Sequence, residues 1–248
     1  MPKARKVIQI IGLVLGLAPP LVGLVAYFAW RHAVPVLRVH AAAQRLLRKQ
    51  EPGKWEDRLK GEIARLGGPE SAAAKIDIYM RSRKPMEASP HEHERVAVEM
   101  LGLCGRSATP VLHRLANEGE PWLRIRVFNS LERIADPNSC DVLCAALNDS
   151  EQPIRLMAAR ALGVIRDPRA VGPLLATFPT EKNVAVFMAV DRALVRIGVP
   201  SVAPLKKLLD TETDPVILGR ISRIVKAIGR RRPDRETGET GRKEGDRK

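Results

Sequence analysis

The chain has 248 residues, of which 45% are hydrophobic and 28% charged, and its formal net charge is +14. Only 4% of the residues are aromatic, which favours close packing of helices through small side chains over a β-rich core. The length suits one folded domain with an appendage.

The positive charge is concentrated near the N-terminus. Residues 1–60 carry 11 basic and 3 acidic side chains, whereas residues 61–229 carry 23 and 20. A surface that wraps a nucleic-acid duplex needs clustered Lys and Arg that neutralise several phosphates. The near balance over residues 61–229 therefore argues against nucleic acid as the partner, and the basic N-terminal part suits anionic lipid.

The first predicted element is a transmembrane helix over residues 7–30. This stretch has no charged residue, and as a helix it would be about 36 Å long, enough to cross a bilayer core of about 30 Å. Tyr27 and Trp30 lie at its far end, where interfacial aromatic residues are expected, and Pro19-Pro20 predicts a kink. A cleaved signal peptide is the alternative, but the apolar run is too long and no small-x-small cleavage site follows it. We therefore interpret the segment as an uncleaved signal-anchor.

A basic juxtamembrane segment over residues 31–54 follows the span. More basic residues lie after the span than before it, so the positive-inside rule favours a cytoplasmic repeat domain. Residues 34–50 predict an amphipathic helix after a break at Pro35, with an apolar stripe from Val36 to Leu47. This helix is either a solvated connector or a helix lying on anionic headgroups. The basic residues predicted to contact headgroups are Arg31, Arg38, Arg45, Arg48 and Lys49.

A predicted helix pair and a polar loop come next. Residues 55–80 give two helices broken at Gly67-Gly68-Pro69, which makes them a candidate degenerate first repeat of a solenoid predicted over residues 55–229. Residues 81–93 are polar and predict a loop. Its two histidines at 91 and 93 make a poor preformed metal site, so we interpret it as a solvated loop.

Regular repeats are predicted over residues 90–229. The clearest unit is residues 152–175, where one helix carries Leu162 and Ile165 on one face and a second helix starts at Pro168. A helix pair this short cannot bury its own apolar stripe and needs copies on either side. Core positions recur every 30 to 32 residues, at Leu101, Leu131, Leu162, Leu194 and Val225.

This unit resembles the HEAT-like repeat of phycobilisome-lyase-type proteins. The resemblance implies an all-α fold, a right-handed α-solenoid of helix pairs in which the second helix of each pair lines the concave side. Lyases of that type attach or detach bilin chromophores, so a bilin-lyase-like enzyme is an alternative function, although the repeat specifies a fold more than a function. The residues that carry the resemblance are Pro153-Ile154-Arg155, Ala158-Ala159, Ala161-Leu162-Gly163, Ile165, Asp167-Pro168-Arg169-Ala170-Val171 and Leu174-Leu175.

Two rows of positions on the repeat helices point away from the predicted core. One row lies two residues before each core position and the other lies six before it, about 40° apart around the helix. Stacked units would align them as an arginine ladder beside an apolar strip. The resemblance to HEAT repeats implies that this strip falls on the concave side, and such a surface suits a peptide or helix. In the alternative, the arginines form salt bridges between repeats. The predicted partner-binding residues are Ile125, Leu156, Met188, Asn129, Arg160, Arg192 and Arg223.

We expect no catalytic residue, cofactor or metal ion. The sequence contains no Gly-rich phosphate loop, nucleophile elbow or paired-carboxylate pattern. Cys104, Cys140 and Cys144 are interpreted as buried free thiols, which favours a reducing compartment. Residues 230–248 predict a disordered charged tail. The sequence therefore predicts a single-pass membrane scaffold that binds an unidentified protein or peptide, with a bilin-lyase-like enzyme or a nucleic-acid-binding repeat module as alternatives.

Overall fold

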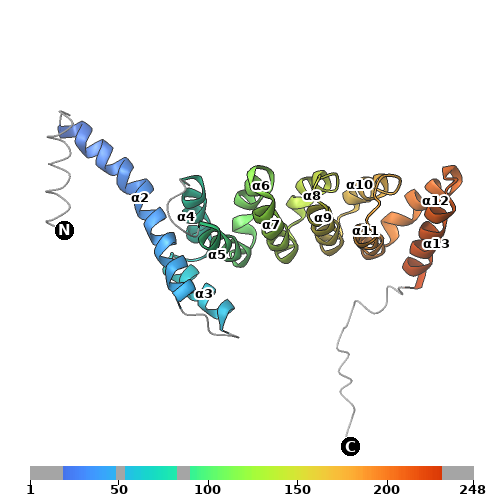
Figure 1. The fold of residues 1–248 in the computed structure, drawn as a ribbon, viewed down its shortest axis with the longest axis horizontal. Helices are drawn as coiled ribbons and strands as arrows, with labels where there is room; N and C mark the ends of the chain where they lie inside the picture. Colours follow the sequence, from blue (N-terminus) through green and yellow to red (C-terminus); the bar gives the residue numbers. More distant parts are fainter. Residues whose placement is uncertain (1–18, 49–53, 83–89, 231–248) are drawn as a thin grey trace, which may run out of the picture. The chain divides into compact units, whose positions relative to one another are not determined.

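The computed structural model describes residues 19–48, 54–82 and 90–230 (Figure 1). Every regular element among these residues is a helix. The chain divides into two compact units, Met1–Val142 and Leu143–Lys248. Each unit stacks helix pairs, as an α-solenoid does, so the predicted all-α fold class is confirmed.

In the first unit, α5 and α7 pack against each other and form the centre of the core. Leu101 on α5 and Leu131 on α7 are both fully buried, as the repeat predicted. Gly102 permits the close approach, because a Cβ atom there would lie 2.9 Å from Oγ of Ser130. The described helices of this unit are α2 (Pro19–Arg48), α3 (Trp55–Arg65), α4 (Pro69–Arg81), α5 (Pro90–Leu103), α6 (Thr109–Glu118) and α7 (Pro121–Ile134).

Helix α2 runs without interruption through Pro35, so the predicted break at that residue is wrong. A proline inside a helix removes one backbone hydrogen bond and costs about 3 kcal/mol, and the apolar face that α2 buries against α4 and α5 offsets this cost. Four side chains on that face are at most 1% exposed: Val39, Ala42, Ala43 and Leu46. Val39, Ala43 and Leu46 of the apolar stripe predicted for residues 34–50 thus pack on protein.

Part of the predicted membrane span lies outside the described residues. The structure does not describe residues 7–18 of that span. It also does not describe Lys49 or residues 231–248 of the predicted tail. Within the three described ranges, no helix has both the length and the apolar character that crossing a bilayer requires.

The polar stretch before α5 also differs from its prediction. Residues 83–89 lie outside the described residues, but His91 and His93 are in the first turns of α5 and not in a loop. Pro90 starts this helix, because its fixed φ and missing N–H suit a first position. The His91 ring meets Trp122 edge-on at a centroid distance of 4.7 Å, and the His93 ring meets His40 at 4.7 Å. These histidines therefore contact other helices of the unit.

In the second unit, α9 and α11 lie side by side (Figure 1) and pack through the fully buried Leu162 and Leu194. Gly163 brings the two backbones together, since a Cβ atom there would lie 2.9 Å from Cα of Ala193. Helix α8 begins before the boundary between the units. The helices are α8 (Cys140–Ala146), α9 (Gln152–Ile165), α10 (Val171–Ala176), α11 (Val184–Ile197), α12 (Val202–Thr211) and α13 (Pro215–Arg230).

The turn inside the clearest repeat forms where its sequence predicted it, but the second α-helix starts at Val171 and not at Pro168. Arg166 adopts φ 58° and ends α9 in the left-handed conformation. The Asp167 side chain then accepts the N–H of Arg169 at 2.8 Å and caps a short 3-10 turn over Pro168–Ala170. Helix α10 begins directly after this turn, at Val171.

The repeat register shifts by one residue in α13. Val225 was predicted as the core position but is partly exposed, whereas Ile224 is 2% exposed. The buried isoleucines follow the steps of four, three and four residues that keep side chains on one helix face, which excludes Val225 from that face. They are Ile217, Ile221, Ile224 and Ile228.

Candidate functional site

In the first unit, ion pairs surround one of the predicted outward positions, Glu99 on α5. Glu99 accepts the indole N–H of Trp55 at 2.8 Å and a hydrogen bond from Arg95 at 2.8 Å. Arg126, on the neighbouring helix α7, lies 3.7 Å from the same carboxylate. Asn129 is exposed and Ile125 is half-buried. Salt bridges between repeats, the alternative interpretation, therefore hold at Glu99.

In the second unit, the predicted ladder residues lie on the surface. Arg160 on α9, Arg192 on α11 and Arg223 on α13 are all exposed. Of the predicted apolar strip, Met188 is 48% exposed, whereas Leu156 is half-buried. The outward direction predicted from helix periodicity is thus correct for these arginines.

A groove of about 370 Å³ lies between α11 and α13 and brings two of the ladder residues together. Arg192 lines one wall and Arg223 the other, whereas Arg160, Leu156 and Met188 do not line it. The sequence prediction missed Arg196, one helical turn after Arg192, although this spacing of four residues on one helix indicates a shared face. The lining residues are Asp191, Arg192, Val195, Arg196, Arg223, Ile224 and Ala227.

The groove carries a positive charge that its own carboxylate does not cancel. Asp191 is engaged by Arg220, whose Nη2 donates to Oδ1 at 2.8 Å. Among the described residues, no carboxylate pairs with Arg192 or Arg196. Arg223 donates only to the Gly219 carbonyl of its own helix, at 3.4 Å. Three guanidinium groups therefore face solvent above an apolar floor, an arrangement that can bind acidic and apolar groups together.

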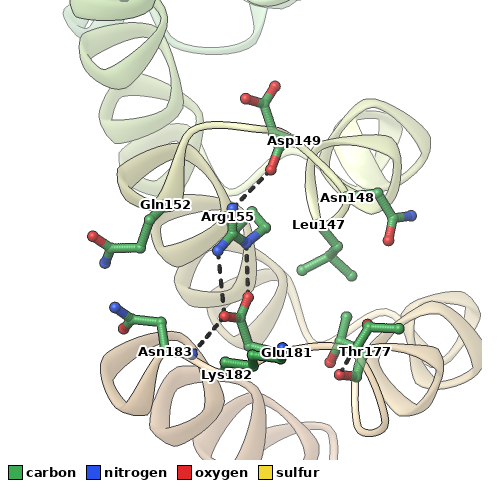
Figure 2. Close-up of a pocket in the computed structure, with 10 residues that line it drawn as sticks. Leu147, Asn148, Asp149, Gln152, Arg155, Thr177, Glu181, Lys182 and Asn183 are labelled. Atoms are coloured by element: carbon green, nitrogen blue, oxygen red, sulfur yellow. Dashed lines mark hydrogen bonds and ion pairs between the residues drawn. The ribbon is translucent and has the colours of Figure 1, made fainter.

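A second pocket of the same unit, of about 670 Å³, lies where the loops before α9 and before α11 meet (Figure 2). Arg155 reaches across it and donates from Nε to Glu181 at 2.7 Å and from Nη2 to the other carboxylate oxygen at 3.3 Å. Its Nη1 donates to the backbone carbonyls of Asp149 at 2.9 Å and Ser150 at 3.1 Å. One arginine thus connects two successive loops.

This second pocket is a structural junction. Burial alone would raise the pKa of Glu181, but the hydrogen bonds from Arg155 and from the Asn183 N–H outweigh it, and the pKa is lowered. The carboxylate and the guanidinium therefore stay charged and bound to each other at neutral pH. Because these groups satisfy one another, the groove between α11 and α13 is the better candidate for binding a partner.

The basic residues predicted to contact lipid headgroups differ in their surroundings. Arg31, Arg38 and Arg48 are exposed on α2. Arg45 donates from Nη2 to Glu62 on α3 at 2.7 Å, with half of its side chain exposed. Burial alone would raise the pKa of Glu62, but the hydrogen bonds from Arg45 and Arg65 lower it.

Comparison with known proteins identifies the repeat. A family model for HEAT repeats matches residues 86–155 and 141–225, together more than half of the chain. A solved structure described as the complex of CpcE and CpcF of phycocyanin lyase from Nostoc sp. PCC7120 is 20% identical, and the match covers 62% of this chain and 98% of that one with a TM-score of 0.42. An engineered protein is 19% identical, with coverage of 77% and 96% and a TM-score of 0.43. No curated protein matches the chain.

Proposed function

Because the chain belongs to the HEAT-repeat family, we propose that it is a scaffold that binds another protein through the groove between α11 and α13. The observation that carries this proposal is the set of three solvent-facing arginines above an apolar floor. Two helices from successive repeats supply them, so correct stacking of the repeats forms the surface. We propose that the protein acts by binding and not by catalysis.

The chemistry of the groove defines the partner. Arginine is favoured at protein interfaces because its planar guanidinium group forms paired hydrogen bonds with carboxylates and its stem packs on apolar groups. A helix with an acidic face and an adjoining apolar stripe satisfies both parts of the groove. Exposed Met188 and Val184, at 48% and 64%, extend the apolar surface along α11.

The N-terminal part of the chain is proposed to hold this scaffold at a membrane. The charge-free stretch over residues 7–30 supplies the span, and the basic residues after it supply contacts to anionic headgroups. Tethering raises the local concentration of the groove for a partner at the same membrane, without any new contact. We also propose that the repeat domain faces the cytoplasm and that the solenoid is right-handed.

Fractionation of the full-length chain tests the tether. We expect the chain to remain in the membrane pellet after carbonate extraction, and the repeat domain to be digested by protease added from the cytoplasmic side. Release of the intact chain by carbonate would contradict the tether while leaving the groove untested.

Site-specific photo-crosslinking tests the groove. A photoreactive amino acid replaces Val195 in the groove in one variant and the exposed Ala203 of α12 in a control variant. Crosslinks from position 195 should map to acidic segments with an apolar stripe and should be absent from position 203. The same products from both positions would argue against a specific surface.

A further inference from the structure

A separate groove in the first unit combines apolar and basic side chains. It encloses about 300 Å³ between α2 and the C-terminal end of α3. Arg58 on α3 fixes the two helices relative to each other, because it donates to the carbonyls of Arg45 at 2.9 Å and Leu46 at 3.2 Å. The lining residues are Val34, Leu37, Arg38, Ala41, Arg45, Arg65 and Leu66.

The basic residues of this groove are held in place by a buried carboxylate. The Glu62 side chain is 4% exposed and pairs with both Arg45 and Arg65, whose side chains are 50% and 67% exposed. Arg45 uses Nε and Nη2 for this contact and Arg65 uses Nη1, so each guanidinium retains N–H groups that are not used on Glu62. Arg38 also lines the groove, so its three arginines and the Glu62 carboxylate leave an excess of two positive charges.

One apolar residue of the groove, Leu37, is largely exposed to solvent. Leu37 is 64% exposed although it lies beside Val34 and Ala41 in the lining, whereas Leu66 is 2% exposed. An exposed leucine next to arginines is the pattern of a surface that meets acyl chains and headgroups together.

The position of the groove along α2 points to the membrane surface. Leu37 follows Trp30, the last residue of the predicted span, by seven residues, or about 10 Å of helix. The helix is continuous from Pro19 to Arg48, so it transmits this spacing rigidly. The polar layer adds about 5 to 8 Å to the hydrocarbon core on each side, so Val34, about 6 Å beyond Trp30, and Leu37 are the α2 residues of the groove nearest to this layer.

We propose that this groove binds one anionic phospholipid, with the phosphate on Arg38, Arg45 and Arg65 and the upper part of an acyl chain against Val34 and Leu37. This inference rests on the proposed membrane tether. It adds Arg65 of α3 to the basic residues predicted from sequence, and it replaces diffuse attraction to anionic lipid with a single site formed by two helices.

Native mass spectrometry of the full-length chain tests the site. The chain is reconstituted into vesicles of equal phosphatidylglycerol and phosphatidylcholine, extracted in mild detergent, and the lipids that stay bound are counted. The test variant is Arg38→Gln with Arg65→Gln, which leaves Glu62 paired with Arg45. The control is Lys206→Gln with Lys207→Gln, two exposed residues of α12 that remove the same charge.

We expect the wild-type chain and the control to retain one phosphatidylglycerol in preference to phosphatidylcholine. In the test variant this preference should fall by roughly 30-fold, which corresponds to about 1 kcal/mol for each basic residue near the surface. An unchanged preference in the test variant, with the chain still in the vesicles, would overturn the site alone. A chain that does not enter the vesicles would overturn the tether and the site with it.

Discussion

Arg220 on α13 donates to Asp191 on α11 at 2.8 Å while only 3% of the Arg220 surface is exposed. Its guanidinium carbon lies 4.2 Å from the ring centroid of Phe178 and 3.9 Å from that of Phe187. The aromatic faces and the carboxylate together compensate for burial of the charge. This contact fixes α13 against α11 and so sets the two walls of the partner groove.

Substituting Asp191 or Arg220 should lower the free energy of unfolding of the second unit by unequal amounts. Asp191→Asn leaves a buried cation without its counter-ion and should destabilise the second unit by about 3 kcal/mol. Arg220→Met should cost less, because methionine fills the space between the two rings and the remaining carboxylate reaches water. Urea unfolding of both variants measures the difference. A larger loss for Arg220→Met would show that the stacking, and not the ion pair, dominates.

A matched pair of glycine substitutions tests the packing of α9 on α11. Gly163→Ala places a methyl group 2.9 Å from Cα of Ala193 and should destabilise the second unit by about 1 to 3 kcal/mol, because the helices must separate. Gly172→Ala on α10 meets nothing within 4 Å and should stabilise by about 0.5 to 1 kcal/mol. Thermal unfolding midpoints report both changes. Equal shifts in the same direction would argue against the close contact.

The Arg155–Glu181 pair predicts a pH dependence of stability. The pKa of Glu181 is lower in the folded state than the ordinary value of 4.5. Its contribution is therefore present above pH 4.5 and is lost as the pH falls through the folded-state pKa. Glu181→Gln should lower the free energy of unfolding by about 2 kcal/mol at pH 7. This gap between the variant and the wild-type chain should narrow below pH 4.5. Urea midpoints from pH 7 to pH 3 measure this gap, and a constant gap would contradict the assignment.

Cys104 should be less reactive than Cys144 in the native chain. Burial raises the pKa of the Cys104 thiol to about 11, so about 0.1% is thiolate at pH 8, and the thiolate is the nucleophile. Cys144 is only partly buried. Timed iodoacetamide alkylation with peptide mapping should label Cys144 well before Cys104, and denaturation should remove the difference. Early labelling of native Cys104 would refute its burial.

The periodic features of this chain were predictable from sequence. Spacings of 30 to 32 residues located Leu101, Leu131, Leu162 and Leu194, because stacked repeats need a buried apolar residue at the same position of every unit. The turn at Asp167-Pro168 was predictable because capping and proline act locally. The same periodicity gave the outward direction of the ladder arginines.

Features that depend on long-range partners were not predictable in this way. The continuity of α2 through Pro35 depends on burial against α4 and α5, which no local pattern reports. The shift from Val225 to Ile224 depends on which face of α13 packs against α11 and α12, which the spacing between repeats does not report. Arg220 sits on an apolar face only because two rings from elsewhere in the unit receive it.

The affinity of the full-length chain for designed probe peptides tests the central claim most directly. One probe is a helix with an acidic face and an apolar stripe, and the other has lysine in place of every glutamate. For the wild-type chain we predict clear preference for the acidic probe by fluorescence anisotropy. Arg192→Glu with Arg223→Glu should weaken it about 100-fold and favour the basic probe, whereas Lys206→Glu with Lys207→Glu should leave the preference intact. Equal affinity of the wild-type chain and the arginine variant for the acidic probe would contradict the proposed groove.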